Sequence, residues 1–149
     1  MDLAALGWTA FFAEAFQPFG DRGLIPARVI IEFNRFLRVA TADDERTVVT
    51  AGSLFHRAAG RAELPAVGDW VALRPRGHGG IIHAVLPRKS RFLRRTAGRV
   101  VEEQIVAANV DTIFLVSGLD DELNPRRIER YLIMARESGA QPVVVLNKS

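Results

Sequence analysis

The sequence predicts a two-part fold, in which a small antiparallel β-barrel is followed by a parallel α/β unit. Residues 27–98 contain several short strand-like runs separated by turn residues, which is typical of a small closed barrel. Residues 110–149 give an apolar run, a helical pattern and a second apolar run, which is the order of a βαβ unit. Residues 1–26 precede both parts as an N-terminal helical extension.

The extension is rich in aromatic residues. Thr9 can cap a short helix, and spacing places Phe12 and Phe16 on one face of it. We expect these rings to pack on the barrel. A membrane anchor is the alternative, but the basic polar face that such a helix needs is missing.

The barrel is expected to contain four strands separated by turn signals. The predicted strands are Arg28–Thr41, Arg46–Leu54, Val67–Leu73 and Ile81–Leu86. The first is long for one strand, so we expect it to bend or bulge. Arg57–Glu63 reads as a polar loop, and the glycine-rich stretch Arg76–Gly80 reads as a hairpin connection. An oligonucleotide-binding (OB) barrel fits this size.

Residues 98–109 are interpreted as the connector between the two parts. Val101, Ile105 and Ala108 share helical spacing, with Glu102 and Glu103 facing away. The barrel is therefore predicted to span residues 27–98, and the α/β unit is predicted to span residues 99–149.

The α/β unit carries clear start and stop signals. Thr112–Ser117 is a continuous apolar run, as in a strand buried on both faces of a parallel sheet. Asn124 can cap the next helix, Pro125 suits its first turn, and Gly139 suits its end. Val143–Leu146 is the second expected strand. In such a unit, ligands bind at the carboxyl ends of the strands.

Asn147 and Lys148 follow the second strand directly. An Asn amide can bond the edge of guanine, and Lys methylenes can cover the purine and the ribose. The pair is the start of Asn-Lys-x-Asp, the guanine-recognition sequence of GTP-binding proteins, whose Asp would be position 150. The alternative interpretation is a polar strand end without a ligand.

A basic segment lies between the two parts, with Phe92 and Leu93 interleaved. Because such side chains neutralise phosphates and an aromatic can stack on a base, RNA contact is predicted. Residues 1–98 carry fourteen basic and nine acidic side chains, a net +5, whereas residues 99–149 carry six and eight, a net −2. Two alternatives remain: a domain seam holding Phe92, or ion pairs from Arg94 and Arg95 to Glu102 and Glu103. The candidate RNA-binding residues are Arg88, Lys89, Arg91, Arg94 and Arg95.

Composition excludes several other classes of function. The 149 residues contain no cysteine, so disulfides and cysteine-ligated metals are absent from them. The three histidines (His56, His78 and His83) lack metal-ligand spacing, so no metal site is predicted. The chain has no apolar run long enough to span a membrane and no basic residue before Arg22, so we expect no signal peptide and a cytoplasmic location.

The motifs occur in a recognisable order. They are Val-Gly-Asp-Trp-Val (67–71), Pro-Arg-x-Ser-x-x-x-Arg (87–94), Ala-Ala-Asn-Val-Asp (107–111), Arg-Tyr-Leu (130–132) and Pro-Val-Val-Val-Leu-Asn-Lys (142–148). Together they resemble the ribosome small-subunit-dependent, circularly permuted GTPases (RsgA, also called YjeQ or EngC). This family resemblance implies an OB barrel followed by a permuted P-loop GTPase domain, in which the guanine motif precedes the phosphate loop. That order agrees with the lack of a Gly-x-x-x-x-Gly-Lys-Ser/Thr loop here.

The resemblance further implies a GTPase that acts in late maturation of the 30S ribosomal subunit and contacts its 16S rRNA. Of the family's functional positions, it assigns Asn147 and Lys148 to guanine. The phosphate loop, the switches and a zinc-binding domain would follow Ser149, so no catalytic residue is assigned. GTP, Mg²⁺ and Zn²⁺ are therefore expected for the full-length protein and none of them for this chain, which we expect to be inactive alone.

One alternative function belongs to a different class, namely a stand-alone OB-fold RNA-binding module without GTPase activity. We also expect the chain to self-associate, because an isolated βαβ unit leaves a strand edge and apolar surface uncovered.

Overall fold

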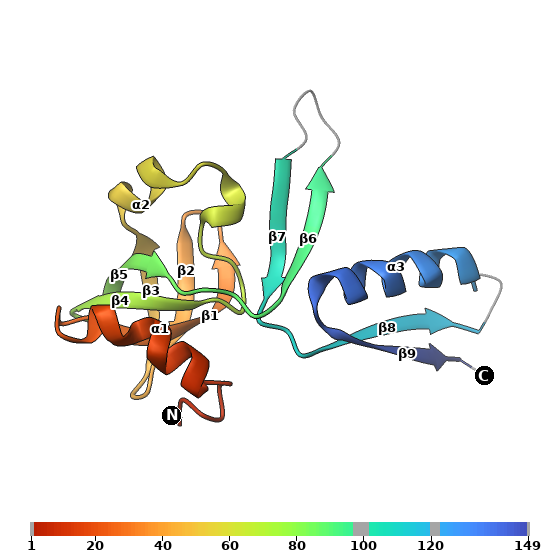
Figure 1. Cartoon of the computed structure of the whole chain (residues 1–149), viewed down its shortest axis with the longest axis horizontal. Helices are drawn as coiled ribbons and strands as arrows, with labels where there is room; N and C mark the ends of the chain where they lie inside the picture. The colour runs from red at the N-terminus through yellow and green to blue at the C-terminus, as the bar shows by residue number, and fades with distance from the viewer. Residues whose placement is uncertain (1, 97–101, 120–122, 149) are drawn as a thin grey trace.

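The computed structural model describes residues 2–96, 102–119 and 123–148, and it divides into a barrel, a β-hairpin and an α/β unit (Figure 1). The elements of the first part are α1 (Ala10–Gly20), β1 (Ile25–Phe33), β2 (Phe36–Ala40), β3 (Glu45–Thr50), α2 (Gly52–Arg57), η1 (Arg61–Glu63), β4 (Trp70–Arg76) and β5 (Gly79–Val85). The remaining elements are β6 (Arg91–Thr96), β7 (Glu102–Ala108), β8 (Thr112–Gly118), α3 (Pro125–Ser138) and β9 (Gln141–Asn147).

Five strands close the barrel in the order β1-β2-β3-β5-β4, with β4 pairing back onto β1. The β3–β5 pair is parallel and the other pairs are antiparallel. This five-stranded closed arrangement confirms the predicted OB-type barrel. Alternate residues of its strands point inward and form the core, which contains Val29, Val39, Val48, Leu73 and Ile82.

Helix α1 covers one side of the barrel, as the aromatic pattern predicted. Phe12 is buried together with Trp70 and Leu86, and the rings of Trp8 and Trp70 lie 4.6 Å apart. Phe16 packs at the border of the same cluster. The aromatic face of the extension is therefore part of the protein core.

The predicted first strand is wrong as a single element, because Arg28–Thr41 folds into the hairpin β1–β2. Asn34 adopts a positive φ of 54°, and Phe33 pairs with Phe36 across the turn. Asn tolerates the left-handed region well, so the Asn-Arg step turns the chain without glycine. The expected irregularity is also present, as a bulge between Val29 and Ile31.

The segment after β3 also differs from the prediction. The strand ends at Thr50, and α2 begins at Gly52, because the Ala51 N–H donates to Ile82 O and fixes the chain against β5. The expected loop Arg57–Glu63 holds the end of α2 and the single turn η1.

The predicted helical connector is wrong within its described part, because residues 102–108 form strand β7 and pair antiparallel with β6. Val101 lies outside the described residues. Ile105 and Ala108 are buried against Ala66 near η1, and Leu93 of β6 packs at the border of this cluster. Pairing with β6 and burial of one face override the helical spacing. The predicted boundary at 98/99 falls between the paired strands.

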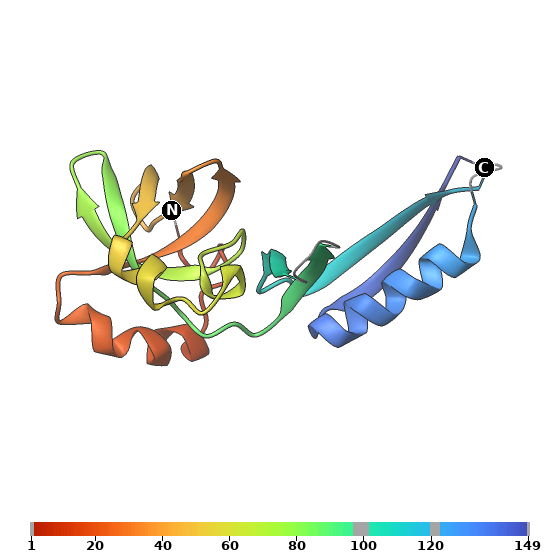
Figure 2. The same cartoon turned by 90° about the horizontal axis from the view of Figure 1, so that it is seen from above.

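The α/β unit has the predicted order. Strands β8 and β9 pair in parallel, and α3 lies along one face of them (Figure 2). Asn124 Oδ1 accepts a hydrogen bond from Arg127 N at 3.1 Å, and Gly139 ends the helix with a φ of 86°. The prediction that β8 is buried on both faces is wrong, because Phe114 and Val116 are about two-thirds exposed on the face without a helix. No helix of the described residues is long and apolar enough to cross a membrane.

Candidate functional site

Asn147 and Lys148 lie exposed at the carboxyl end of β9. Asn147 stands beside Gly118, the last residue of β8, and Asn147 O accepts a hydrogen bond from Leu119 N at 2.8 Å. Asn147 Oδ1 accepts from Lys148 N at 2.9 Å, and Lys148 adopts a φ of 64°. Both polar side chains therefore stand at the edge of a parallel sheet where ligands bind. Their contact with guanine stays a prediction.

Arg88 is held in a buried ion pair. Its Nε donates to Asp69 Oδ1 at 2.7 Å and its Nη2 to Asp69 Oδ2 at 2.6 Å, while Asp69 is fully buried. The guanidinium also donates to the carbonyls of Ala62 and Leu64, and Asp69 Oδ2 accepts from Ala66 N at 2.9 Å. Four donors of Arg88 are thus engaged within the protein, which gives this residue a structural role whether or not RNA binds.

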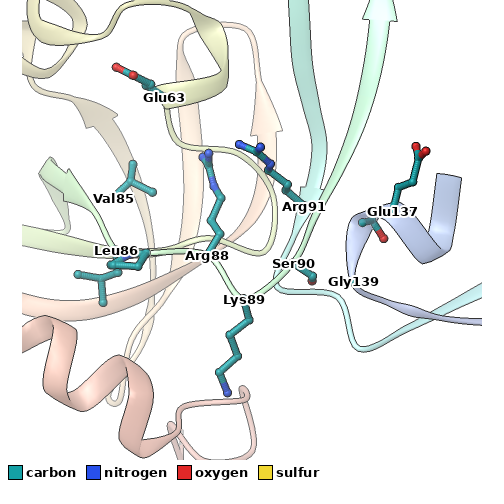
Figure 3. Close-up of a pocket in the computed structure, with 11 residues that line it drawn as sticks. Glu63, Val85, Leu86, Arg88, Lys89, Ser90, Arg91, Glu137 and Gly139 are labelled. Atoms are coloured by element: carbon teal, nitrogen blue, oxygen red, sulfur yellow. The ribbon is translucent and has the colours of Figure 1, made fainter.

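The next residues of the basic segment point in different directions (Figure 3). Lys89 Nζ donates to Thr9 Oγ1 at 2.9 Å and lies 5.1 Å from the ring centre of Phe12. Arg91 is exposed and borders a cleft of about 660 Å³, whose wall also contains Glu63 and Glu137. The basic segment therefore does not form one continuous cationic edge over the residues whose side chains are described.

The other predicted residues of the segment lie on β6. Phe92 is half-buried and lines a cavity together with Tyr131 and Met134 of α3, as in the seam alternative. Arg95 stands opposite Glu103 in the register of β6 and β7. The side chains of Arg94 and Arg95 are not among those described, so their predicted contacts are left open.

Asn109 joins the barrel to the α/β unit, a role that sequence reasoning missed. It is buried and has a φ of 54°. Its Oδ1 accepts from Lys89 N at 2.8 Å and its Nδ2 donates to Gly68 O at 3.1 Å. Its N–H donates to Ser90 O at 2.8 Å, and its carbonyl accepts from Arg28 Nη2 at 3.1 Å. One residue thus connects three segments of the barrel region.

Gly68 and Ser90 complete this joint. Ser90 Oγ donates to Val110 O at 2.8 Å. Gly68 has a φ of 90°, and a Cβ at this position would lie 2.0 Å from Ala108 O, so only glycine fits. The motifs Val-Gly-Asp-Trp-Val and Ala-Ala-Asn-Val-Asp supply these residues. Gly68 and Asn109 of these motifs are the residues that could have indicated the joint, although the sequence does not show that they lie in contact.

Arg28 supports the joint from strand β1. It also donates to Leu6 O, and its guanidinium lies 5.9 Å from the ring centre of Trp70. Burial lowers the pKa of Arg28, while the charges of Asp111 and Asp69 act in the opposite direction. The side chain therefore ties the N-terminal segment, the barrel and the start of the α/β unit together.

Within the described residues, no group of three or more acidic, histidine or cysteine side chains is placed to hold a metal ion.

The fold, a five-stranded barrel followed by a βαβ unit, is shared with several solved structures, and two of them illustrate the match. The chain matches YloQ, a circularly permuted GTPase, with a TM-score of 0.60 and 17% identity, over 83% of this chain and 40% of that one. It matches YjeQ from Thermotoga maritima with a TM-score of 0.64 and 23% identity, over 84% of this chain and 41% of that one.

Sequence comparison gives the family. Residues 85–149 match the model of the RsgA GTPase family. The whole chain aligns with the small ribosomal subunit biogenesis GTPase RsgA of Opitutus terrae at 54% identity, and with that of Syntrophotalea carbinolica at 46%. It spans 43% of the length of each. The chain is therefore related over its whole length to the RsgA GTPases, and the predicted family is confirmed.

Proposed function

We propose that the chain is part of a GTPase that acts in maturation of the small ribosomal subunit. The observation that supports this most strongly is the alignment of all 149 residues with GTPases named for that process. In this proposal the barrel contacts 16S rRNA of the 30S subunit, and the carboxyl ends of β8 and β9 hold guanine. A cytoplasmic location follows from the ribosomal partner.

The division of work within the protein is also part of the proposal. The α/β unit is proposed to begin with the segment that leaves the barrel, because the family match starts at residue 85 and β6 pairs with β7. GTP, its Mg²⁺ and the residues that contact phosphate belong to the proposed full-length protein. Zn²⁺ belongs to a further domain of it, as the family resemblance implies.

Asn147 is the residue of this chain that would read the base. Its amide can donate to O6 or N7, the acceptors on the exposed edge of guanine. The methylenes of Lys148 would lie over the purine, and its ammonium would favour the anionic nucleotide. These two side chains bind and orient the ligand, and they perform no bond-breaking step.

Calorimetry of GTP binding tests this proposal. In the full-length protein, Asn147→Ala should weaken GTP binding by about tenfold to a hundredfold, the usual worth of a base contact of this kind. Asn34→Gly, at the exposed β1–β2 turn, serves as the matched control and should leave GTP affinity unchanged. Equal GTP affinity in Asn147→Ala and wild type would contradict the guanine assignment.

The 149-residue chain by itself provides a second measurement in the same experiment. Without the residues that contact phosphate, we expect neither GTP hydrolysis nor binding at low micromolar concentration. Low-micromolar GTP affinity of this chain would refute the proposed division of work.

Salt-dependent binding to the small subunit tests the basic segment. We propose that Arg91, Arg94 and Arg95 contact rRNA phosphates, while Arg88 remains in its ion pair with Asp69. Replacing the three by Ala should weaken 30S binding and reduce the slope of log affinity against log salt by about 2. An unchanged slope would assign β6 to the seam between barrel and α/β unit alone.

A further inference from the structure

A second group of arginines lies on the outer face of the barrel, away from the basic segment. On β4, Arg74 and Arg76 are both exposed and are separated by one residue, so they point to the same side of the sheet. They occupy the end of β4 that is remote from Asp69 and Arg88, on the side of the barrel away from the α/β unit (Figure 1).

The barrel topology brings two further arginines to this face. Ile25 pairs antiparallel with Leu73, so the chain before β1 enters the barrel beside the second half of β4, and Arg22 and Arg76 both lie close enough to His83 to act on its pKa. Thr50 pairs with Ile82, and α2 begins two residues later against β5. Arg57 is the exposed last residue of α2. Four arginines from three separate stretches of the sequence thus gather around β4 and β5.

His83 lies at the centre of this group. In the β4–β5 pair, Ala72 stands opposite Ala84 and Leu73 opposite Ile82, which leaves His83 as the extra residue of a β-bulge. Bulges redirect a side chain and are common beside functional sites. His83 Nε2 is buried and has no hydrogen-bond partner among the described residues.

The charged groups that act on the pKa of His83 are all arginines. Burial lowers its pKa, and the charges of Arg74, Arg22, Arg76 and Arg57 lower it further. None of the ion pairs found in the described residues involves these four arginines. Asp21, an exposed neighbour of Arg22 in sequence, is the nearest acidic residue along the chain. The four guanidinium groups therefore have no ion-pair partner among the described residues and are accessible to an external anion.

We propose that Arg22, Arg57, Arg74 and Arg76 form a surface that binds the phosphate backbone of RNA, with His83 at its centre. This deepens the proposed function, on which it rests, by assigning RNA to a second side of the barrel. Several cations spread over three elements fit a chain of phosphates better than a single anion. No Phe, Tyr or Trp belongs to the group and His83 Nε2 is buried, so we expect binding to follow the RNA backbone.

Salt-dependent RNA binding by the 149-residue chain tests this surface. The variant R22Q/R74Q/R76Q should bind a labelled RNA hairpin roughly tenfold more weakly at 0.1 M salt, with a salt slope smaller by about 2. Arg57 is left in place because its Nε donates to Ser53 O within α2. The matched control R126Q/R127Q/R136Q removes three exposed arginines from α3 and should keep the wild-type slope.

The imidazole of His83 gives an independent readout by NMR. Bound phosphates favour the charged form, so RNA should raise the pKa of His83 in the wild-type chain and far less in R22Q/R74Q/R76Q. Inorganic phosphate is the second probe, and a single anion should raise this pKa less than RNA does. A phosphate effect as large as that of RNA would overturn the assignment to an RNA backbone.

Other outcomes separate this surface from the proposed GTPase. Equal salt slopes for wild type and R22Q/R74Q/R76Q, or an equal loss of RNA affinity in the control variant, would overturn the assignment of this surface. Either result would place RNA binding elsewhere on the chain. Absence of RNA binding by the wild-type chain would overturn it as well. In each case the GTP titration with Asn147→Ala remains a separate test of the GTPase proposal.

Discussion

Single residues of the basic segment have roles that depend on partners distant in sequence. Arg88 and Lys89 are adjacent, yet Arg88 is paired with buried Asp69 and Lys89 lies over the rings of α1. A sequence run shows that charge is present, but it does not show that a buried carboxylate nineteen positions earlier will engage one of these side chains. Asn109 was missed for the same reason, because its four partners come from three other segments.

The Asp69–Arg88 pair should contribute strongly to stability. Asp69→Asn removes the charge and leaves the guanidinium of Arg88, whose side chain is only 14% exposed, without its counter-ion, so we expect the free energy of unfolding to fall by about 3 kcal/mol. Urea denaturation followed by circular dichroism measures this change. Glu45→Gln removes the exposed partner of Arg38 and is the control, with little expected effect. A loss in Asp69→Asn no larger than in Glu45→Gln would show that the pair is not important for folding.

Elements were predictable where local signals agree with tertiary structure. Asn124, Pro125 and Gly139 mark the ends of α3 correctly, and the glycine-rich stretch before β5 gives the expected hairpin. The predictions failed where the pairing of strands determines the secondary structure. Asn34 turns a hairpin inside a continuous strand-like run, and β7 becomes a strand because β6 lies beside it. At the candidate site, Asn147 and Lys148 could be placed at a strand end from sequence, whereas the joint at Asn109 could not.

The cap of α3 is a feature whose stability contribution can be isolated. Asn124→Ala removes the acceptor for Arg127 N and should lower the free energy of unfolding by about 1 kcal/mol. Asn124→Asp keeps an acceptor oxygen and is the matched control. Thermal and urea denaturation of the three proteins measure the difference. Equal loss in both variants would point to a role of the amide nitrogen instead of the cap.

At the scale of the whole molecule, the α/β unit exposes an apolar sheet face. Within the described residues β8 and β9 form a two-stranded sheet, α3 covers one side of it, and Phe114 and Val116 are about two-thirds exposed on the other side. Apolar surface of this extent favours association, and the strand edges can pair with another chain.

Self-association of the 149-residue chain should therefore increase with protein concentration in sedimentation velocity experiments. F114K places a charge on the open face and should shift the chain towards monomer. F55K, at an exposed position on α2, is the control and should leave association unchanged. A wild-type chain that stays monomeric at high concentration would disprove the expectation.

The joint at Asn109 has a mechanical consequence for the far end of the sheet. Strand β8 begins three residues after Asn109, and its seven residues extend about 20 Å to the point where Gly118 meets Asn147. A tilt of about 5° at the joint would displace that tip by about 2 Å, which is several times the range of about 0.5 Å over which hydrogen-bond lengths vary. The hydrogen bonds of one buried asparagine thus fix the direction of the sheet, and with it the position of Asn147 and Lys148 at its far end.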